Sequence, residues 1–241
     1  MSLAEIVSRA NPALESLSFT DPVACVYNPL SYAWELHKQY LDAFGVGAKQ
    51  VVLLGMNPGP FGMVQTGVPF GEVAAVKSWM GLDGEVATPA EEHPKRPILG
   101  LQSTRSEVSG RRLWGWAAAR FGTPARFAER FFVYNYCPLA FLGESGANLT
   151  PDKLKRSETA PLFEICDRVL REVVERLSPE WVVGVGAFAE ARVRRVFSGE
   201  VGAGALKVGR VPHPSPASPA ANRGWEQLAD AAFADLGIAL G

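Results

Sequence analysis

The sequence predicts a three-layer α/β/α fold around a central, mostly parallel sheet of four strands. Four short apolar runs read as strands, and they cover residues 50–55, 131–136, 181–185 and 206–211. The first run, QVVLLG, shows no alternation of apolar and polar residues, which is typical of a parallel strand buried on both faces. Helical patterns of about the right length separate the runs, as parallel βα crossovers require.

The expected helices follow in chain order. Residues 3–17 read as a helix that is interrupted at Pro12. Residues 31–44 read as a second helix, which Ser31 caps and Gly45 stops. The other helical patterns cover residues 73–80, 111–121, 162–177, 187–197 and 226–236.

Two of the three histidines lie outside the strand ends. His37 falls within the second helix, and we interpret it as a surface or packing histidine. His93 lies in an irregular connection between Glu92 and Pro94, where we expect it to be solvated.

The composition excludes several classes of protein. The hydrophobic content of 47% is ordinary for a globular protein, and no apolar run approaches the roughly 18 residues that a membrane helix needs. The first residues, MSLAEIVSRANP, lack the basic start and apolar core of an export signal. We therefore expect no membrane contact. With no repeat or linker in the sequence, residues 1–241 are expected to form a single domain.

The cysteines indicate a reducing compartment. Cys25, Cys137 and Cys166 are odd in number and far apart, without a CxxC pair. This spacing argues against a disulfide framework and against an iron–sulfur cluster. We expect a cytoplasmic protein, associated with the nucleoid in a bacterium or located in the nucleus of a eukaryote.

The loop after the first strand is the most informative stretch. Gly55 to Gly71 comprises 17 residues, of which five are glycine and three are proline. A loop of this length is either disordered or functional, and its apolar residues argue against disorder. We interpret it as the wall of a pocket.

Three polar side chains follow strand ends and are expected to meet. Asn57 comes just after the first strand, Asn135 ends the second, and His213 follows the fourth. Ligands of open α/β sheets bind outside the carboxyl ends of the strands. An asparagine amide can match the N3–H and O4 edge of uracil or thymine, and Phe70 could stack on the ring, worth about 1–3 kcal/mol. Simpler readings stay open: a turn former at Asn57, a partner of buried backbone at Asn135, and a core residue at Phe70.

The same loops exclude other chemistries. They hold no carboxylate pair, Ser/His/Asp arrangement or His/Cys cluster, so neither a metal site nor an acyl-transfer triad is expected. Gly55 to Gly62 lacks the GK[ST] ending of a phosphate-binding P-loop. Gly184 to Ala189 is a short match to a dinucleotide fingerprint, and tight strand–helix packing is the favoured reading. We expect no metal, nucleotide or other cofactor.

The net charge does not indicate binding to a polyanion, but two local stretches of the sequence are basic. The net charge is −1, yet five basic residues and a single acidic one, Glu107, lie between Lys95 and Arg112. Three basic residues and no acidic one lie between Ala205 and Gly224. Such stretches could hold a phosphate backbone on one face. On charge alone, an equally good interpretation is that these arginines are scattered over the surface and solvated.

Three segments resemble a known family. GMNPGPFGMVQTGVPFGE and HPSPASPAANRGW closely resemble the two signature motifs of single-strand-selective monofunctional uracil-DNA glycosylases, within the uracil-DNA glycosylase superfamily, and FFVYNYCPL resembles the family's central strand. The segments occur in family order and span residues 51–225. The resemblance implies a base-excision-repair enzyme that hydrolyses the N-glycosidic bond of deoxyuridine, and also oxidised 5-substituted uracils such as 5-hydroxymethyluracil. It implies a monomer that acts on uracil-containing single- and double-stranded DNA and leaves an abasic site.

The resemblance also implies residue roles. Asn57 matches the asparagine that orients the hydrolytic water, and His213 the histidine that hydrogen-bonds uracil O2. Asn135 matches the base-reading asparagine, and Phe70 the stacking phenylalanine. Residues that match the lining of the base pocket are Met56, Gly59 and Met63.

DNA contacts are implied for the second motif. The matching residues are Ser215, Pro216, Ala217, Ser218 and Arg223. The family often carries an arginine at the position of Ala217, where it fills the gap left by the extruded base. A methyl group cannot fill that gap, so discrimination between single and double strands is in question.

Two other functions remain open on the sequence. A catalytically weak, lesion-binding DNA protein is possible because Asn57 stands where other branches of the superfamily use an aspartate. A Rossmann-type oxidoreductase built on Gly184 to Ala189 is the other.

Overall fold

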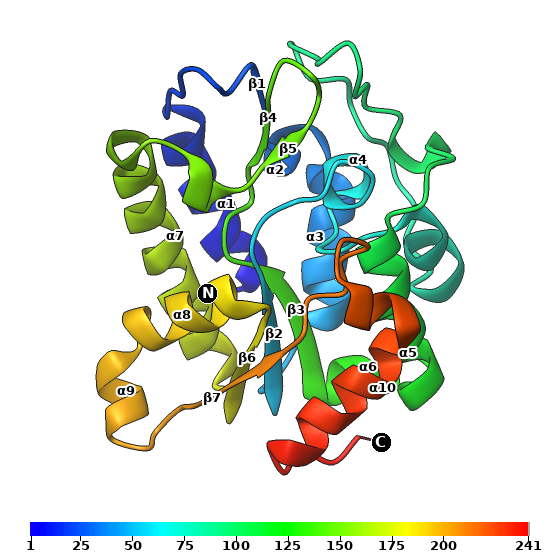
Figure 1. The fold of residues 1–241 in the computed structure, drawn as a ribbon, viewed down its shortest axis with the longest axis vertical. Coiled ribbons are helices and arrows are strands. Elements are labelled where there is room, and N and C mark those ends of the chain that lie inside the picture. The colour runs from blue at the N-terminus through cyan, green and yellow to red at the C-terminus, as the bar shows by residue number, and fades with distance from the viewer. Residues whose placement is uncertain (241) are drawn as a thin grey trace.

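The computed structural model describes residues 1–240 and contains the expected central sheet. Its strands are parallel and lie in the order β3-β2-β6-β7 (Figure 1). Their bounds are Val51–Gly55 for β2, Phe131–Asn135 for β3, Trp181–Val185 for β6 and Lys207–Val211 for β7. The sequence prediction of a four-stranded parallel sheet is confirmed.

Helices cover both faces of this sheet. On one face, Phe131 packs edge-on against Trp116 of α5 (Val108–Phe121) and against Phe233 of α10 (Pro219–Asp235). On the other face, Phe132 stacks on Tyr40 of α3 (Trp34–Phe44), with ring centroids 5.6 Å apart. Successive residues of a strand point to opposite faces, so β3 contacts both helical layers. The three-layer prediction is confirmed.

The remaining helices complete these layers. α1 (Leu3–Glu15) contacts both α3 and α7 (Arg156–Leu177). The other helical segments are α2 (Pro29–Tyr32), α4 (Met63–Thr66), η1 (Ala75–Trp79), η2 (Gly100–Gln102), α6 (Pro124–Arg130), η3 (Pro151–Lys153), α8 (Ala187–Val196) and α9 (Ser198–Gly202). In the described part of the chain, no helix is both long and apolar enough to cross a membrane. A single domain over the whole chain stays a prediction.

A second sheet was not expected. β1 (Cys25–Tyr27), β4 (Ala140–Leu142) and β5 (Asn148–Leu149) pair in antiparallel fashion in the order β1-β4-β5. Strands of two or three residues are too short to show a period in the sequence. This sheet brings Asn148 and Thr150 to the site described below.

Two expected helices differ from the sequence interpretation. α1 continues through Pro12 instead of breaking there, because its buried face, which includes Leu14, is packed against the core. The helix expected at residues 31–44 is divided into α2 and α3. Asn28 caps α2, with its Oδ1 accepting from the Leu30 N–H at 3.2 Å, so Ser31 is not a cap. Gly45 ends α3 as expected.

Three other helices begin earlier than expected. α7 begins at Arg156 and passes through Pro161. α5 begins at Val108, and α10 begins at Pro219, where the Ser218 hydroxyl accepts from the Ala221 N–H at 3.3 Å. The early starts of α5 and α10 matter because both lie beside the pocket loops.

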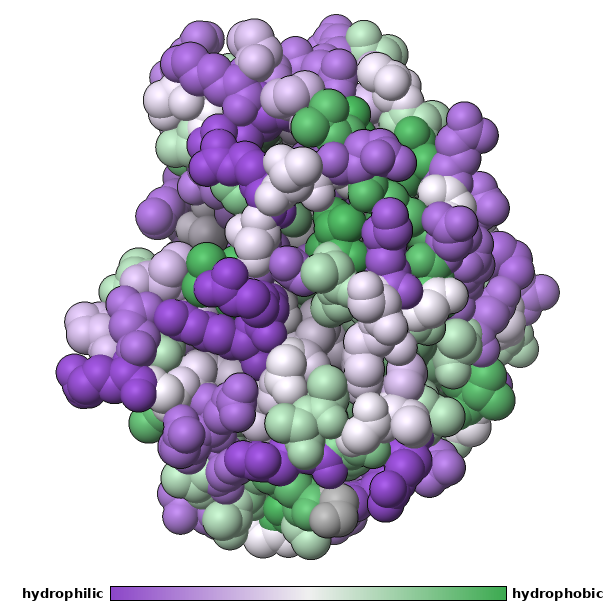
Figure 2. Space-filling model, turned by 90° about the vertical axis from the view of Figure 1, so that its right-hand side faces the viewer, coloured by the Kyte–Doolittle hydropathy of each residue, from purple (hydrophilic) through white to green (hydrophobic). Residues whose placement is uncertain are grey.

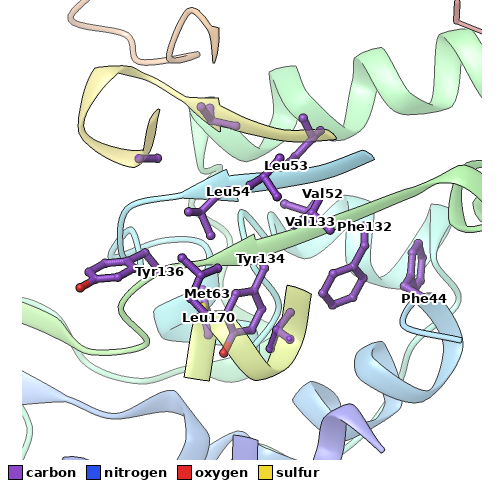
Figure 3. Close-up of a cluster of buried hydrophobic side chains, with 14 of the residues drawn as sticks. Phe44, Val52, Leu53, Leu54, Met63, Phe132, Val133, Tyr134, Tyr136 and Leu170 are labelled. Carbon is purple, nitrogen blue, oxygen red and sulfur yellow. The ribbon is translucent and has the colours of Figure 1, made fainter. Parts of the chain in front are cut away.

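The core continues into the loop after β2. Figure 3 shows the side chains of β2 and β3 packed between the helical layers, with Met63 of α4 beside Tyr134. Met63 is 2% exposed. The long loop is therefore anchored in the core, which agrees with the expectation that it is ordered.

Both histidines outside the strand ends are buried. His37 is 1% exposed, and its Nδ1 lies 2.6 Å from the carbonyl oxygen of Gly67 in the loop after β2. This confirms a packing role. His93 is 4% exposed, so the expectation that it is solvated was wrong. Its Nδ1 accepts from the Lys95 backbone N–H at 3.1 Å, and the backbone N–H of His93 donates to the Tyr27 hydroxyl at 2.8 Å.

The burial of His37 makes stability depend on pH. Burial lowers its pKa from 6.5 to about 4, so the unfolded chain binds a proton in that range while the folded chain does not. We expect the free energy of unfolding to fall by about 3 kcal/mol as the pH drops from about 6.5 to about 4. Urea titrations at several pH values measure it.

His37→Phe is the control for that titration. It removes the titrating ring, so most of the slope between pH 6.5 and 4 should disappear. Any remaining slope comes from other groups, including His213, whose pKa is also lowered. An unchanged slope in His37→Phe would contradict the assignment.

Candidate active site

A cavity of about 290 Å³ opens at the carboxyl end of the parallel sheet. It lies near the lower end of the range, about 300–1,000 Å³, of small-molecule pockets. The loops after β2 and β7 meet there (Figure 1). The residues predicted from the sequence that line it are Met56, Asn57, Gly59, Met63, Phe70, Asn135, His213, Ser215 and Pro216. The expected convergence of two amides and a histidine is therefore present.

Gly55, the last residue of β2, lets two of these side chains approach each other. A Cβ atom there would lie 2.3 Å from Asn135 Oδ1 and 2.5 Å from Phe70 Cε2. Phe70 itself has a φ of 55°, a left-handed conformation that costs a non-glycine residue roughly 1–3 kcal/mol. Its ring lies 6.0 Å from the His213 ring, centroid to centroid. The strained backbone conformation of Phe70 therefore places its ring at the pocket wall.

Asn135 lines the cavity and carries a buried acceptor without a partner among residues 1–240. Its side chain is 3% exposed, and its Nδ2 lies 3.2 Å from Met63 Sδ. Its Oδ1 has no hydrogen-bond partner among residues 1–240. An unsatisfied buried polar atom costs about 1–3 kcal/mol. Asn135 therefore does not serve buried backbone groups, and its acceptor is available to a ligand.

Asn57 is held loosely. Its Nδ2 donates to the Leu139 carbonyl oxygen at 3.4 Å, the long end of a hydrogen bond. The side chain is half-buried and borders the cavity. Its amide oxygen can therefore accept from a water molecule in the cavity.

His213 stands at the end of β7 with a lowered pKa. His213 lines the cavity and is exposed, with Gly186 close to its Cβ. Partial loss of solvent around the ring lowers its pKa from 6.5. At neutral pH the imidazole is uncharged, with one nitrogen as donor and the other as acceptor.

The segment 184–189 packs as favoured from the sequence. A Cβ at Gly184 would lie 2.3 Å from the Glu190 nitrogen, and one at Gly186 would lie 3.4 Å from His213 Cβ. Gly186 has a φ of 96°, in the left-handed region. These glycines bring α8 close to β6 and leave room for His213.

Sequence reasoning missed Glu107, because we expected no carboxylate at the site. Glu107 precedes α5, lines the cavity, and accepts from the Phe61 N–H through Oε2 at 3.4 Å. A Cβ at Gly59 would lie 2.6 Å from that oxygen. Burial raises the pKa of Glu107. The available signal was a lone acid within a basic stretch. Other missed lining residues are Pro60, Gly62, Ser109, Asn148 and Thr150.

Arg112 of α5 holds the loop after β7. Its Nη1 donates to the carbonyl oxygens of Pro214 at 3.0 Å and Ser215 at 3.1 Å. Its Nη2 donates to Asn222 Oδ1 at 2.7 Å, and Asn222 Nδ2 donates to the Pro216 carbonyl at 2.9 Å. The residues next to His213 are thus fixed from α5 and α10 together.

The other residues of the second motif lie beside the cavity rather than in its lining. Ala217 is exposed, with its N–H donating to Ser215 Oγ at 3.1 Å. Ser218 caps α10, and Arg223 is exposed on the first turns of that helix. Their contact with DNA stays a prediction.

Comparisons with known proteins agree with this geometry. The family model of the uracil DNA glycosylase superfamily matches residues 43–237. The chain belongs to the uracil-DNA glycosylase superfamily. Among curated relatives, the single-strand selective monofunctional uracil-DNA glycosylase of Rattus norvegicus is 49% identical over 95% of this chain and 82% of its own length. That of Bos taurus is 48% identical over 95% of this chain and 84% of its own length.

A solved structure supports the fold of this superfamily member. Pedobacter heparinus SMUG2 has a TM-score of 0.63 and 18% sequence identity, covering 98% of this chain and 99% of that one. At this identity the likeness concerns the fold alone. The family resemblance and the fold expected from the sequence are both confirmed.

Arg112→Met should loosen the loop after β7. Removing hydrogen bonds from a charged donor, worth about 1.5–3 kcal/mol each, should speed hydrogen exchange at the Ser215 and Ala217 amides at least about tenfold. Hydrogen exchange followed by mass spectrometry measures it. Arg120→Met is the matched control, because Arg120 ties the same helix to Asp230 of α10 at a distance from the loop. Equal loop exchange in the two variants would refute the role of Arg112.

Proposed function

We propose that the protein is a monofunctional DNA glycosylase that removes uracil from DNA and leaves an abasic site. Membership of the superfamily makes it a uracil-DNA glycosylase, a hydrolase that acts on N-glycosyl bonds. The observation that carries the proposed specificity is the unpartnered Oδ1 of Asn135, buried at the cavity wall.

Asn135 has the groups to read the base. Its Oδ1 would accept from uracil N3–H, and its Nδ2 would donate to O4. Cytosine offers a bare N3 and an amino group at the same edge, so an amide in this orientation would face acceptor with acceptor and donor with donor. The Phe70 ring borders the same cavity and supplies the stacking surface, worth about 1–3 kcal/mol for a base.

Hydrolysis of the glycosidic bond requires stabilisation of the charge on the leaving base and a water molecule positioned at C1′. When the C1′–N1 bond breaks, its electron pair leaves with the base and negative charge spreads to O2. The neutral His213 would donate a hydrogen bond to O2, and one such donor is typically worth about 3–4 kcal/mol. Asn57 would hold a water against C1′. The water oxygen bonds to C1′ as its proton is released, and the base takes up a proton in solution.

The substrate range is proposed to include small oxidised 5-substituents such as 5-hydroxymethyl. Gly59 and Gly62 add no side chain to the cavity wall. Both single- and double-stranded DNA are proposed as substrates. With only a methyl at Ala217, the gap left by an extruded base stays unfilled, so a duplex substrate has to bear the unstacking cost of a few kcal/mol. The proposal includes a monomer that needs no cofactor.

His213→Ala should separate chemistry from binding. Without the donor to O2, release of free uracil from a single-stranded oligonucleotide should slow by about 100- to 1,000-fold. Affinity for the oligonucleotide should change by less than about threefold. His213→Gln, which keeps a donor, should be slowed less. Single-turnover assays with labelled uracil measure the release, and fluorescence anisotropy measures the affinity.

Two results would count against the proposal. A His213→Ala variant that loses affinity but keeps its single-turnover rate would remove His213 from the chemistry. A wild-type protein that binds uracil-containing DNA and releases no free uracil would favour a lesion-binding protein instead.

A further inference from the structure

A cationic rim lies beside the cavity. We define the Phe61 rim as Phe61, Lys95, Arg96 and Arg105. Phe61 belongs to the loop after β2, and its neighbours Pro60 and Gly62 both line the cavity. The three cations come from the connection that leads to α5, along the right of Figure 1. Figure 2 shows that side of the molecule, with hydrophilic surface around an apolar area in its upper part.

The Phe61 ring holds two guanidinium groups in place. The Arg105 guanidinium carbon lies 4.3 Å from the ring centroid, and that of Arg96 lies 5.2 Å from it. A guanidinium over an aromatic face keeps its N–H donors free for a phosphate. Because stacking orders the side chains before a ligand arrives, less conformational entropy is lost on binding.

The rim's positive charge is not neutralised by acids of the described chain. Among residues 1–240, no carboxylate forms an ion pair with Lys95, Arg96 or Arg105 within 4.0 Å. The nearby Glu92 accepts from the Ile98 N–H at 2.6 Å. Glu107, the acid of this basic stretch, turns its carboxylate to Gly59 and the Phe61 N–H. Lys95 and Arg105 are exposed, so their charge is available to a polyanion.

Phe61 also couples the rim to the cavity. Its backbone N–H donates to Glu107, and Glu107 lines the cavity wall. Ser215 and Pro216 of the loop after β7 line the same cavity. A nucleic-acid strand that places one base in the cavity therefore lies near both the second motif and the Phe61 rim.

We propose that the Phe61 rim binds backbone phosphates of the substrate strand next to the extruded nucleotide. Arg105 and Lys95 contact phosphate oxygens directly, and Phe61 orders Arg105 for that contact. This surface grips the strand that carries the damaged base and needs no complementary strand. It rests on the proposed function only in taking the ligand to be DNA, and it explains the basic stretch that the second motif leaves unused.

The test is the salt dependence of binding. The probe is a single-stranded oligonucleotide with a tetrahydrofuran abasic analogue, which has no base to release, titrated by fluorescence anisotropy between 50 and 200 mM salt. For the double variant Lys95→Gln/Arg105→Gln, we expect affinity at 50 mM salt to fall about tenfold. The slope of log affinity against log salt should flatten by about 0.7 for each phosphate that the variant no longer neutralises.

Two control variants sharpen the result. Phe61→Leu keeps all the charges but removes the ring, so affinity should fall about threefold with an unchanged salt slope. Arg126→Gln removes an exposed charge from α6, which precedes β3 and thus lies at the opposite end of the sheet. It should bind like the wild type.

The outcome is independent of the chemistry. Under saturating enzyme, the Lys95→Gln/Arg105→Gln variant should release uracil at the wild-type single-turnover rate within about twofold. A double variant with wild-type affinity and salt slope, or one that behaves like Arg126→Gln, would overturn the proposal. A wild type that releases no uracil would refute the glycosylase activity, while the anisotropy titration would still decide whether the rim binds the strand.

Discussion

The missing side chain at Gly55 is the constraint on which the site depends. Its backbone ends β2 in register with Asn135 of β3, and any Cβ atom there would collide with the Asn135 amide and the Phe70 ring. The proposed pocket for a flat base needs the amide of Asn135 and the ring of Phe70 close together. Parallel pairing of β2 and β3 supplies that proximity, and β7 brings His213 to the same end of the sheet.

The N-terminal end of α5 contacts both loops of the site. Glu107 receives the Phe61 N–H of the loop after β2, and Arg112 donates to the Pro214 and Ser215 carbonyls of the loop after β7. Between them, Gly110 allows close approach of the Phe70 carbonyl, since a Cβ atom at residue 110 would lie 2.0 Å from that oxygen. A single helix end thus contacts both loops of the site.

Much of the site could be read from the sequence, because the strand ends are local signals. Gly55, Asn135 and His213 lie at or just after the ends of apolar runs, so a parallel sheet is enough to bring them together. Glu107 and Arg112 gave no such signal. Glu107 contacts a residue 46 positions away, and β5 is too short to show a period. Likewise His93 is buried beside residues distant in the chain, such as Tyr27, whose hydroxyl accepts from its backbone N–H, so the polar residues that flank it in sequence did not predict its burial.

The central claim is that Asn135 Oδ1 accepts a hydrogen bond from the N3–H of uracil. A crystal structure of the protein with free uracil tests this most directly. It should place N3 about 2.7–3.2 Å from Asn135 Oδ1, with O2 toward His213 and the ring parallel to Phe70. Uracil bound with N3 turned away from Asn135, or seated outside the cavity, would contradict the account.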